Sequence, residues 1–197
     1  MRVRWSEVAR GTLIGAALLA AGIVAWRAAG PAIEIARFRA ELLVAEPPGT
    51  LPVPVEGVAP GDLGDTWGDP RSGGRRRHEG IDIFAARRTP IRSATRGIVA
   101  RRSENGLGGN TITILGPGGW RHYYAHMQSY AGHVEGDRVE PGEVIGFVGT
   151  SGNAPPDAPH LHYGIYTRDG PRNPYPLLAP APRGDARSVE SEEPPRP

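Results

Sequence analysis

Three short motifs place histidine and aspartate side chains at spacings that could bind a metal ion. His78 and Asp82 are four residues apart, so both lie on the same face of an extended strand. His160 and His162 are two residues apart and again share one strand face. His126 ends a run of strand-forming residues. Because neighbouring strands are about 4.8 Å apart, adjacent strands could bring the three motifs together.

This set of residue types is suited to zinc chemistry. A catalytic zinc ion takes three histidine or carboxylate ligands and keeps one position open for water. His78, Asp82 and one imidazole of the His160 and His162 pair supply such a set. The other imidazole of that pair and His126 are then available beside the metal as general base, general acid or oxyanion donor.

Other side chains near these motifs have simpler expected roles. His122 and His133 have no such partners in sequence, and we expect both to be surface residues. Glu79 points to the opposite strand face from the preceding histidine, which argues against a role as general base. Tyr124 shares a strand face with His126, where lining the site, packing in the core and catalysis all stay open.

The composition favours a turn-rich β protein. The chain has 197 residues, 39% of them hydrophobic, with 28 glycines and 21 prolines that fall between short β-branched runs. This count excludes long helical bundles and coiled coils. The absence of cysteine excludes disulfides, thiolate zinc sites and cysteine nucleophiles. The formal net charge is only +2 and the basic clusters are short, so we expect no nucleic-acid partner.

Residues 51–178 are predicted to form the folded domain. Short strands alternate there with glycine-rich turns, and no helical period of any length occurs. The expected strands cover residues 53–58, 78–84, 91–94, 98–101, 111–115, 120–126, 144–148 and 161–166. The prediction is an all-β sheet or sandwich-like domain.

Residues 1–30 are predicted to be a cytoplasmic stub and signal anchor. The uncharged run 11–26 follows Arg2, Arg4 and Arg10. It is slightly short for a bilayer span of about 20 residues and slightly long for a cleaved signal. No good small-x-small cleavage site follows it, which favours a retained transmembrane helix over a cleaved signal peptide or a buried soluble helix.

The two remaining segments flank the domain. Residues 31–50 are predicted to be an amphipathic helical spacer that begins at Pro31 and stops before the Pro47-Pro48 pair. Apolar residues recur in it at helical spacing, at Ile35, Phe38, Leu42 and Ala45. Residues 179–197 are rich in proline and charge, so we expect a disordered tail.

The motif order resembles the lysostaphin-type (LytM-type) zinc endopeptidases of bacterial cell walls. The matching motifs are His78-Glu-Gly-Ile-Asp82, Tyr124-Ala-His126 and Pro-His160-Leu-His162, within a resemblance that spans about residues 64–167. The resemblance implies an antiparallel β fold with a groove across the sheet. It also implies Zn²⁺ ligands at His78, Asp82 and His162, with His126 and His160 as catalytic residues beside the metal.

The implied function is a zinc-dependent metalloendopeptidase that hydrolyses peptide bonds in peptidoglycan stems or cross-links during cell-wall remodelling. The chain would be a single-pass protein of the cell membrane with its catalytic domain periplasmic or extracellular. Two alternatives stay open: a non-catalytic docking module or regulator of a wall hydrolase on the same fold, and a zinc enzyme with another peptide substrate. The bond cut and the need for a protein activator or inhibitor are left open. The proline-rich loop 153–158 is longer than usual, which bears on substrate selectivity.

Overall fold

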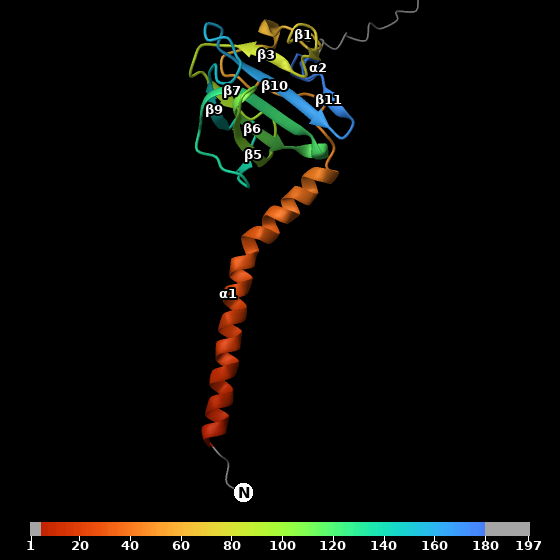
Figure 1. The fold of residues 1–197 in the computed structure, drawn as a ribbon. Helices are drawn as coiled ribbons and strands as arrows, with labels where there is room; N and C mark the ends of the chain where they lie inside the picture. The colour runs from red at the N-terminus through yellow and green to blue at the C-terminus, as the bar shows by residue number, and fades with distance from the viewer. Residues whose placement is uncertain (1–4, 180–197) are drawn as a thin grey trace, which may run out of the picture.

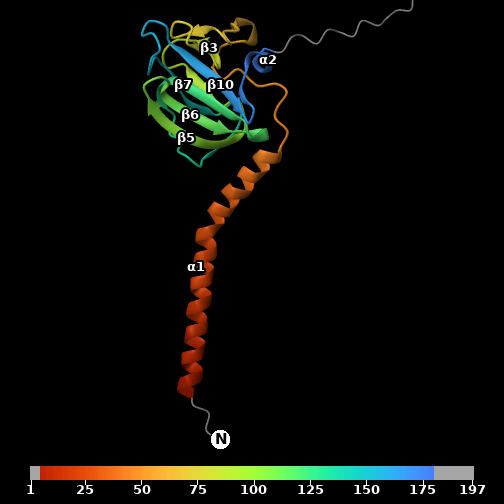
Figure 2. The same ribbon diagram turned by 45° about the vertical axis from the view of Figure 1, so that its right-hand side comes forward.

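The computed structural model describes residues 5–179. Figure 1 shows a β domain from which one long helix, α1 (Trp5–Val44), leads away. Figure 2 shows the same arrangement after a 45° turn. The predicted tail, residues 179–197, lies outside the described residues except for Ala179.

The domain is built around a nine-stranded sheet in which every pairing is antiparallel. Its strands are β3 (Ile81–Phe84), β4 (Pro90–Arg92), β5 (Gly97–Asn105), β6 (Gly109–Leu115), β7 (Arg121–Tyr130), β8 (Arg138–Val139), β9 (Val144–Val148), β10 (His160–Thr167) and β11 (Gly170–Arg172). The main path runs β11-β10-β7-β6-β5-β8, while β3 pairs with β10 and β9 pairs with both β4 and β7. The predicted all-β class is confirmed.

Shorter elements complete the domain. The strands β1 (Pro70–Arg71) and β2 (Arg76–Arg77) form a separate antiparallel hairpin. The helical elements are η1 (Pro60–Asp62), η2 (Pro117–Gly119) and α2 (Tyr175–Leu178). Strands β1, β2, β8 and β11 were not predicted, because two or three residues are too few to show an alternating pattern.

One expected strand is missing and one is shorter than expected. Residues 53–58 contribute only an isolated bridge between Val55 and Ile91. Pro52 and Pro54 have no backbone N–H to donate, so this segment cannot form a continuous ladder. The expected strand 78–84 starts only at residue 81, where its pairing with β10 begins.

Alternation along the strands separates the core from the functional face. In β10, Leu161, Tyr163 and Ile165 are fully buried in the core, where they pack with Ile81 and Ile83 of β3. The residues between them, including the motif histidines, point to the other face of the sheet. The apolar positions therefore fix which face the polar positions must use.

The helix α1 is continuous through Pro31, where we expected a separate spacer helix to begin. It bends part-way along its length (Figure 1), as a proline that removes one helical hydrogen bond explains. Within residues 5–179, no helix combines the length and the hydropathy of a membrane span. The membrane anchor stays a prediction.

The last turns of α1 contact the β domain. Leu42 is fully buried, whereas Ile35 from the predicted apolar stripe is 37% exposed. Glu41 forms an ion pair with Arg96 at 2.8 Å, and the Arg138 guanidinium lies 4.6 Å from the centre of the Phe38 ring. Among the described residues, these contacts join the final turns of the helix to the domain.

His122 is fully buried, so the prediction that it is a surface residue is wrong. It lies on the central strand β7 and shares the core face with Tyr124. Its Nδ1 is hydrogen-bonded to the Tyr163 hydroxyl at 2.7 Å, while its buried Nε2 has no partner among the described residues. Burial lowers the pKa of His122 from 6.5 to about 3.

We expect this buried imidazole to make the domain less stable in acid. Between about pH 6.5 and pH 3 the unfolded chain binds a proton at His122 that the folded chain does not, so the free energy of unfolding falls as the pH falls. The expected loss from this group is about 2 kcal/mol between pH 7 and pH 5. Urea unfolding at both pH values, for the wild type and His122→Asn, measures it. An equal loss in the variant would contradict the assignment.

Candidate metal centre

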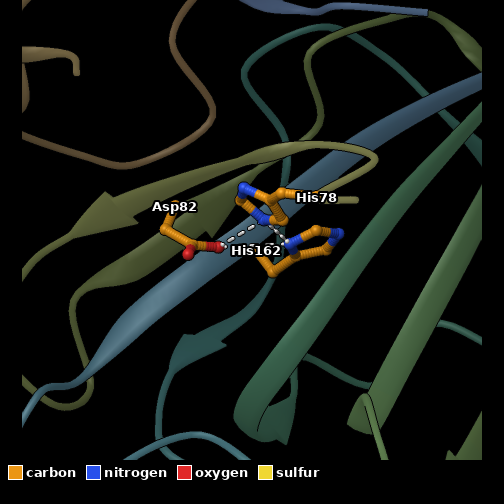
Figure 3. Close-up of side chains that lie close together, drawn as sticks. All are labelled: His78, Asp82 and His162. Atoms are coloured by element: carbon orange, nitrogen blue, oxygen red, sulfur yellow. Dashed lines mark hydrogen bonds and ion pairs between the residues drawn. The ribbon is translucent and has the colours of Figure 1, made fainter. Parts of the chain in front are cut away.

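Two side chains from paired strands and one from the segment before β3 converge at one point (Figure 3). Nε2 of His78 lies 2.8 Å from Nδ1 of His162, and both nitrogens lie 3.1 Å from Oδ1 of Asp82. His162 is directly opposite Asp82 in the β3–β10 register, and His78 reaches the same point from the turn before β3. The two imidazole nitrogens and the carboxylate oxygen form the candidate metal-binding group of the described residues.

The surrounding contacts orient these three groups. Nδ1 of His78 donates to the carbonyl of Thr66 at 2.7 Å, which leaves Nε2 as the atom able to bind a metal. Arg71 donates to Oδ2 of Asp82 at 2.6 Å, so that oxygen is occupied while Oδ1 faces the imidazoles. Burial raises the pKa of Asp82, but hydrogen bonds from His162 and His78 outweigh it and hold that pKa well below its usual range. Asp82 is therefore a carboxylate.

The donor set fits zinc. Catalytic zinc sites hold the ion with three histidine or carboxylate ligands, here His78, Asp82 and His162. Ligand atoms about 2.0–2.1 Å from a tetrahedral ion are about 3.3 Å from one another. The separations of 2.8 and 3.1 Å found here are slightly shorter. The residues present can thus hold the ion that the sequence resemblance implies.

His160 and His126 lie beside this group. Nε2 of His160 is 3.8 Å from Oδ1 of Asp82, and the His160 and His126 rings are 4.9 Å apart between centres. Nδ1 of each donates to a backbone carbonyl at 2.8 Å, that of Ala158 for His160 and that of Ser151 for His126. Each ring therefore keeps its Nε2 for the site. All five predicted site residues are close together in the structure.

A β-bulge brings His126 to this face. His126 has a φ of 61°, in the left-handed region that residues other than glycine rarely adopt. The β6–β7 pairing shifts there, so that Ala125 and His126 together lie opposite Thr111. Without the extra residue, His126 would share the core face of Tyr124. Tyr124 is fully buried and its hydroxyl accepts from the backbone N–H of Ala94, so it is a core residue.

Two glycine-containing turns hold the bulge in place. The N–H of His126 donates to the carbonyl of Gly108 at 2.7 Å, while its ring is held by Ser151. Gly109 has a φ of 63°, and a Cβ there would lie 2.2 Å from Oγ of Ser151. The two turns can approach this closely only because residue 109 has no side chain. The glycines around the motif therefore position a histidine.

Gly80 likewise allows a close approach, here to the predicted ligand His162. A Cβ at this position would lie 2.5 Å from the carbonyl oxygen of Tyr163 and 2.7 Å from Cε1 of His162. Only glycine allows the backbone to lie this close to β10, with His78 before it and Asp82 after it both at the site. The glycine between the two ligand residues is thus required by packing.

The centre lies on the floor of a groove of about 920 Å³. Aromatic rings line part of it, namely Phe84, Tyr123 and Tyr166. One end is formed by the loop 153–158, of which Asn153, Ala154, Pro155 and Ala158 line the groove. The β1–β2 hairpin forms another wall with Arg71, Arg75, Arg76 and Arg77. The groove is large enough for several residues of an extended peptide.

Sequence reasoning missed two residues that line the groove. Arg71 was not singled out because its contact with Asp82 depends on a hairpin of two-residue strands. Tyr123 lines the groove, whereas Tyr124, for which site lining, core packing and catalysis were all left open, lies in the core because the bulge places it on the face opposite His126. Because side chains alternate along β7, the core position of Tyr124 places the preceding Tyr123 on the groove face.

Comparison with known proteins finds relatives in sequence and in fold. The chain is 45% identical over 124 residues to the L-Ala–D-Glu endopeptidase of Bacillus subtilis, covering 57% of this chain but only 38% of that relative. The fold matches the catalytic domain of lysostaphin from Staphylococcus simulans with a TM-score of 0.53 and 28% identity, over 60% of this chain and 94% of that one.

A second structure, a putative glycyl-glycine endopeptidase LytM from Ruminococcus gnavus, has a TM-score of 0.54 and 32% identity, over 73% of this chain and 62% of that one. Residues 76–174, about half of the chain and all five predicted site residues, match the sequence family named Peptidase family M23. The resemblance to lysostaphin-type endopeptidases is therefore confirmed, and the chain belongs to peptidase family M23.

Proposed function

We propose that this chain is a zinc-dependent metalloendopeptidase that hydrolyses peptide bonds in peptidoglycan stems or cross-links. The observation that carries the proposal is the convergence of His78, Asp82 and His162 on one point, with two further histidines beside them. The relatives named as endopeptidases support a peptide substrate. The volume of the groove, about 920 Å³, is consistent with such a substrate.

His78, Asp82 and His162 would hold the ion. When bound, zinc supplies Lewis-acid chemistry, which polarises a carbonyl group and makes water a better nucleophile. Asp82 keeps one negative charge at the centre, and Arg71 holds that carboxylate in one orientation. Thr66 fixes the tautomer of His78 through Nδ1. These contacts limit the freedom of the ligands before a substrate arrives.

His126 and His160 would handle protons and charge. Burial lowers the pKa of His126 to about 4, so its Nε2 is unprotonated at neutral pH and can accept a proton from the attacking water. His160 presents its Nε2 close to the Asp82 carboxylate, where the ring can hydrogen-bond to the water or to the oxygen that gains negative charge in the transition state. Glu79 is exposed on the groove wall, away from this cluster.

A non-catalytic docking module on the same fold is the alternative. A binding module would not need the bulge at His126 or the carbonyl contacts that orient both Nε2 atoms. The presence of all five side chains in one cluster favours the enzyme.

We also propose that α1 anchors the chain in the cell membrane, with the domain on the outer side, where peptidoglycan is found. The uncharged run 11–26 behind three arginines supports this proposal. The continuous helix would extend from the membrane into the domain, where its last turns are packed.

Removal of the metal is expected to abolish hydrolysis. A chelator should stop the release of fragments from purified peptidoglycan, and added zinc should restore it. His78→Ala, Asp82→Ala and His162→Ala should each lose both zinc and activity, because each removes one of only three protein ligands. Elemental analysis beside mass analysis of the fragments measures both properties.

His126→Ala and His160→Ala provide the contrast. Each should keep its zinc and lose about 100- to 1000-fold in rate, since each removes a group that acts on the reacting atoms only. His133→Ala, a histidine away from the groove, is the matched control and should keep both. A chelated sample that digests peptidoglycan at full rate would show the zinc assignment to be wrong. Wild-type activity in all five site variants would leave the docking module as the better proposal.

The anchor has its own test. A reporter enzyme fused after Pro197 is expected to be active only outside the cytoplasm, and the full-length chain should be recovered with the membrane fraction. Activity only in the cytoplasm would overturn the orientation. A mature form that starts near residue 30 would show instead that the run is a cleaved signal peptide.

A further inference from the structure

The β1–β2 hairpin concentrates positive charge along one wall of the groove. Four of its arginines line the groove, namely Arg71, Arg75, Arg76 and Arg77. Arg71 is bound to Asp82 at the centre, whereas the other three, here called the arginine wall, are exposed. None of the three forms an ion pair with a carboxylate within residues 5–179.

Hydrogen bonds position the arginine wall but use only some of its N–H donors. Nε of Arg75 donates to the carbonyl of Ser72, and Nε and Nη2 of Arg76 donate to the Ser72 hydroxyl. Nη1 of Arg77 donates to the carbonyl of Gly68. Every guanidinium has five N–H donors, so each of the three keeps N–H groups with no partner in the described part of the chain. The cations are positioned by neutral acceptors and keep their full charge.

Two arginines elsewhere on the domain, unlike those of the wall, form ion pairs with carboxylates. Arg92 pairs with Glu56 and Arg96 pairs with Glu41. Among the residues that line the groove, Glu79 is the one carboxylate besides Asp82. Burial of Tyr166 raises the pKa of its hydroxyl, and the nearby negative charge of Glu79 raises it further. The three cations of the wall therefore outnumber the exposed carboxylate that shares their groove.

We propose that the arginine wall binds a free carboxylate of the substrate, which makes the groove selective for acidic peptides over neutral ones. The proposal rests on the proposed peptidase function. A guanidinium presents two parallel N–H groups that match the two oxygens of a carboxylate. Arg71 pairs with Arg76 in the hairpin and contacts Asp82, so a carboxylate bound at the wall would hold the rest of the peptide in the groove that contains the metal centre.

Two kinds of carboxylate share this chemistry, and the substrates can distinguish them. Four synthetic stem peptides would differ only in whether an internal free carboxylate and the C-terminal carboxylate are present or converted to amides. The full wild-type chain is expected to cleave one carboxylate form with a kcat/KM about tenfold or more above that of its amide. The amide substitution that lowers the rate identifies which carboxylate is bound.

Variants of the wall test the assignment. Arg75→Gln, Arg76→Gln and Arg77→Gln, singly and together, should bring the carboxylate-to-amide ratio toward one, while the lysine variants should keep part of it. Arg101→Gln removes the same charge from an exposed position outside the groove and should keep the wild-type ratio. Glu79→Gln should raise the ratio, because it removes a repelling charge. Thermal unfolding checks that each variant is folded.

The outcomes separate this proposal from the peptidase function. Two results would contradict carboxylate binding by the arginine wall and leave the peptidase function unaffected. One is cleavage of all four peptides at equal rates by the wild type, and the other is an equal loss of kcat/KM on the carboxylate and amide forms in the glutamine variants. If no peptide is cleaved, calorimetric binding of the same peptides decides the matter. Tighter binding of a carboxylate form that weakens in Arg76→Gln supports the wall on its own, and equal binding of all forms overturns it.

Discussion

The register between β3 and β10 places His162 directly across from Asp82, and the candidate site depends on this one pairing. Side chains alternate along a strand, so a slip of one residue would bring Leu161 to the site and place His162 in the core. The apolar residues between the ligands prevent such a slip. Leu161, Tyr163, Ile81 and Ile83 are all buried at 0–1% exposure, and moving them to the groove would expose them together. The hydrophobic core therefore sets the ligand geometry.

The strained backbone at His126 is the second requirement. A residue other than glycine in the left-handed region costs on the order of 1–3 kcal/mol, so the surrounding structure must hold it there. The carbonyls of Gly108 and Ser151 do so by accepting from its backbone and from its ring. Gly109 allows the two turns to meet. This cost is located at one residue whose ring faces the proposed reaction.

The two oxygens of Asp82 have different charged or polar neighbours. Oδ1 faces three imidazoles and Oδ2 faces Arg71, so the carboxylate is shared between the candidate ion and a fixed cation. Arg71 is also the point where the centre meets the arginine wall. One hairpin thus contributes both to the order of the metal ligands and to the charge of the groove, which links the proposed catalysis to the proposed choice of substrate.

The sequence by itself determined the all-β class and the five residues that cluster, because both follow from the two-residue period of strands and from motif order. The motif spacing left open which histidine of the 160 and 162 pair faces Asp82, and the family resemblance pointed to His162, which the pairing register places opposite Asp82. The sequence did not show that a bulge moves Tyr124 to the face opposite His126, and it misplaced His122, which lies buried on the core face of β7. Only the tertiary structure decided these points, together with the continuous helix through Pro31 and the arginine hairpin. Apart from the helix, whose continuity is local, each of them depends on contacts between segments that are far apart along the chain or too short to carry a pattern.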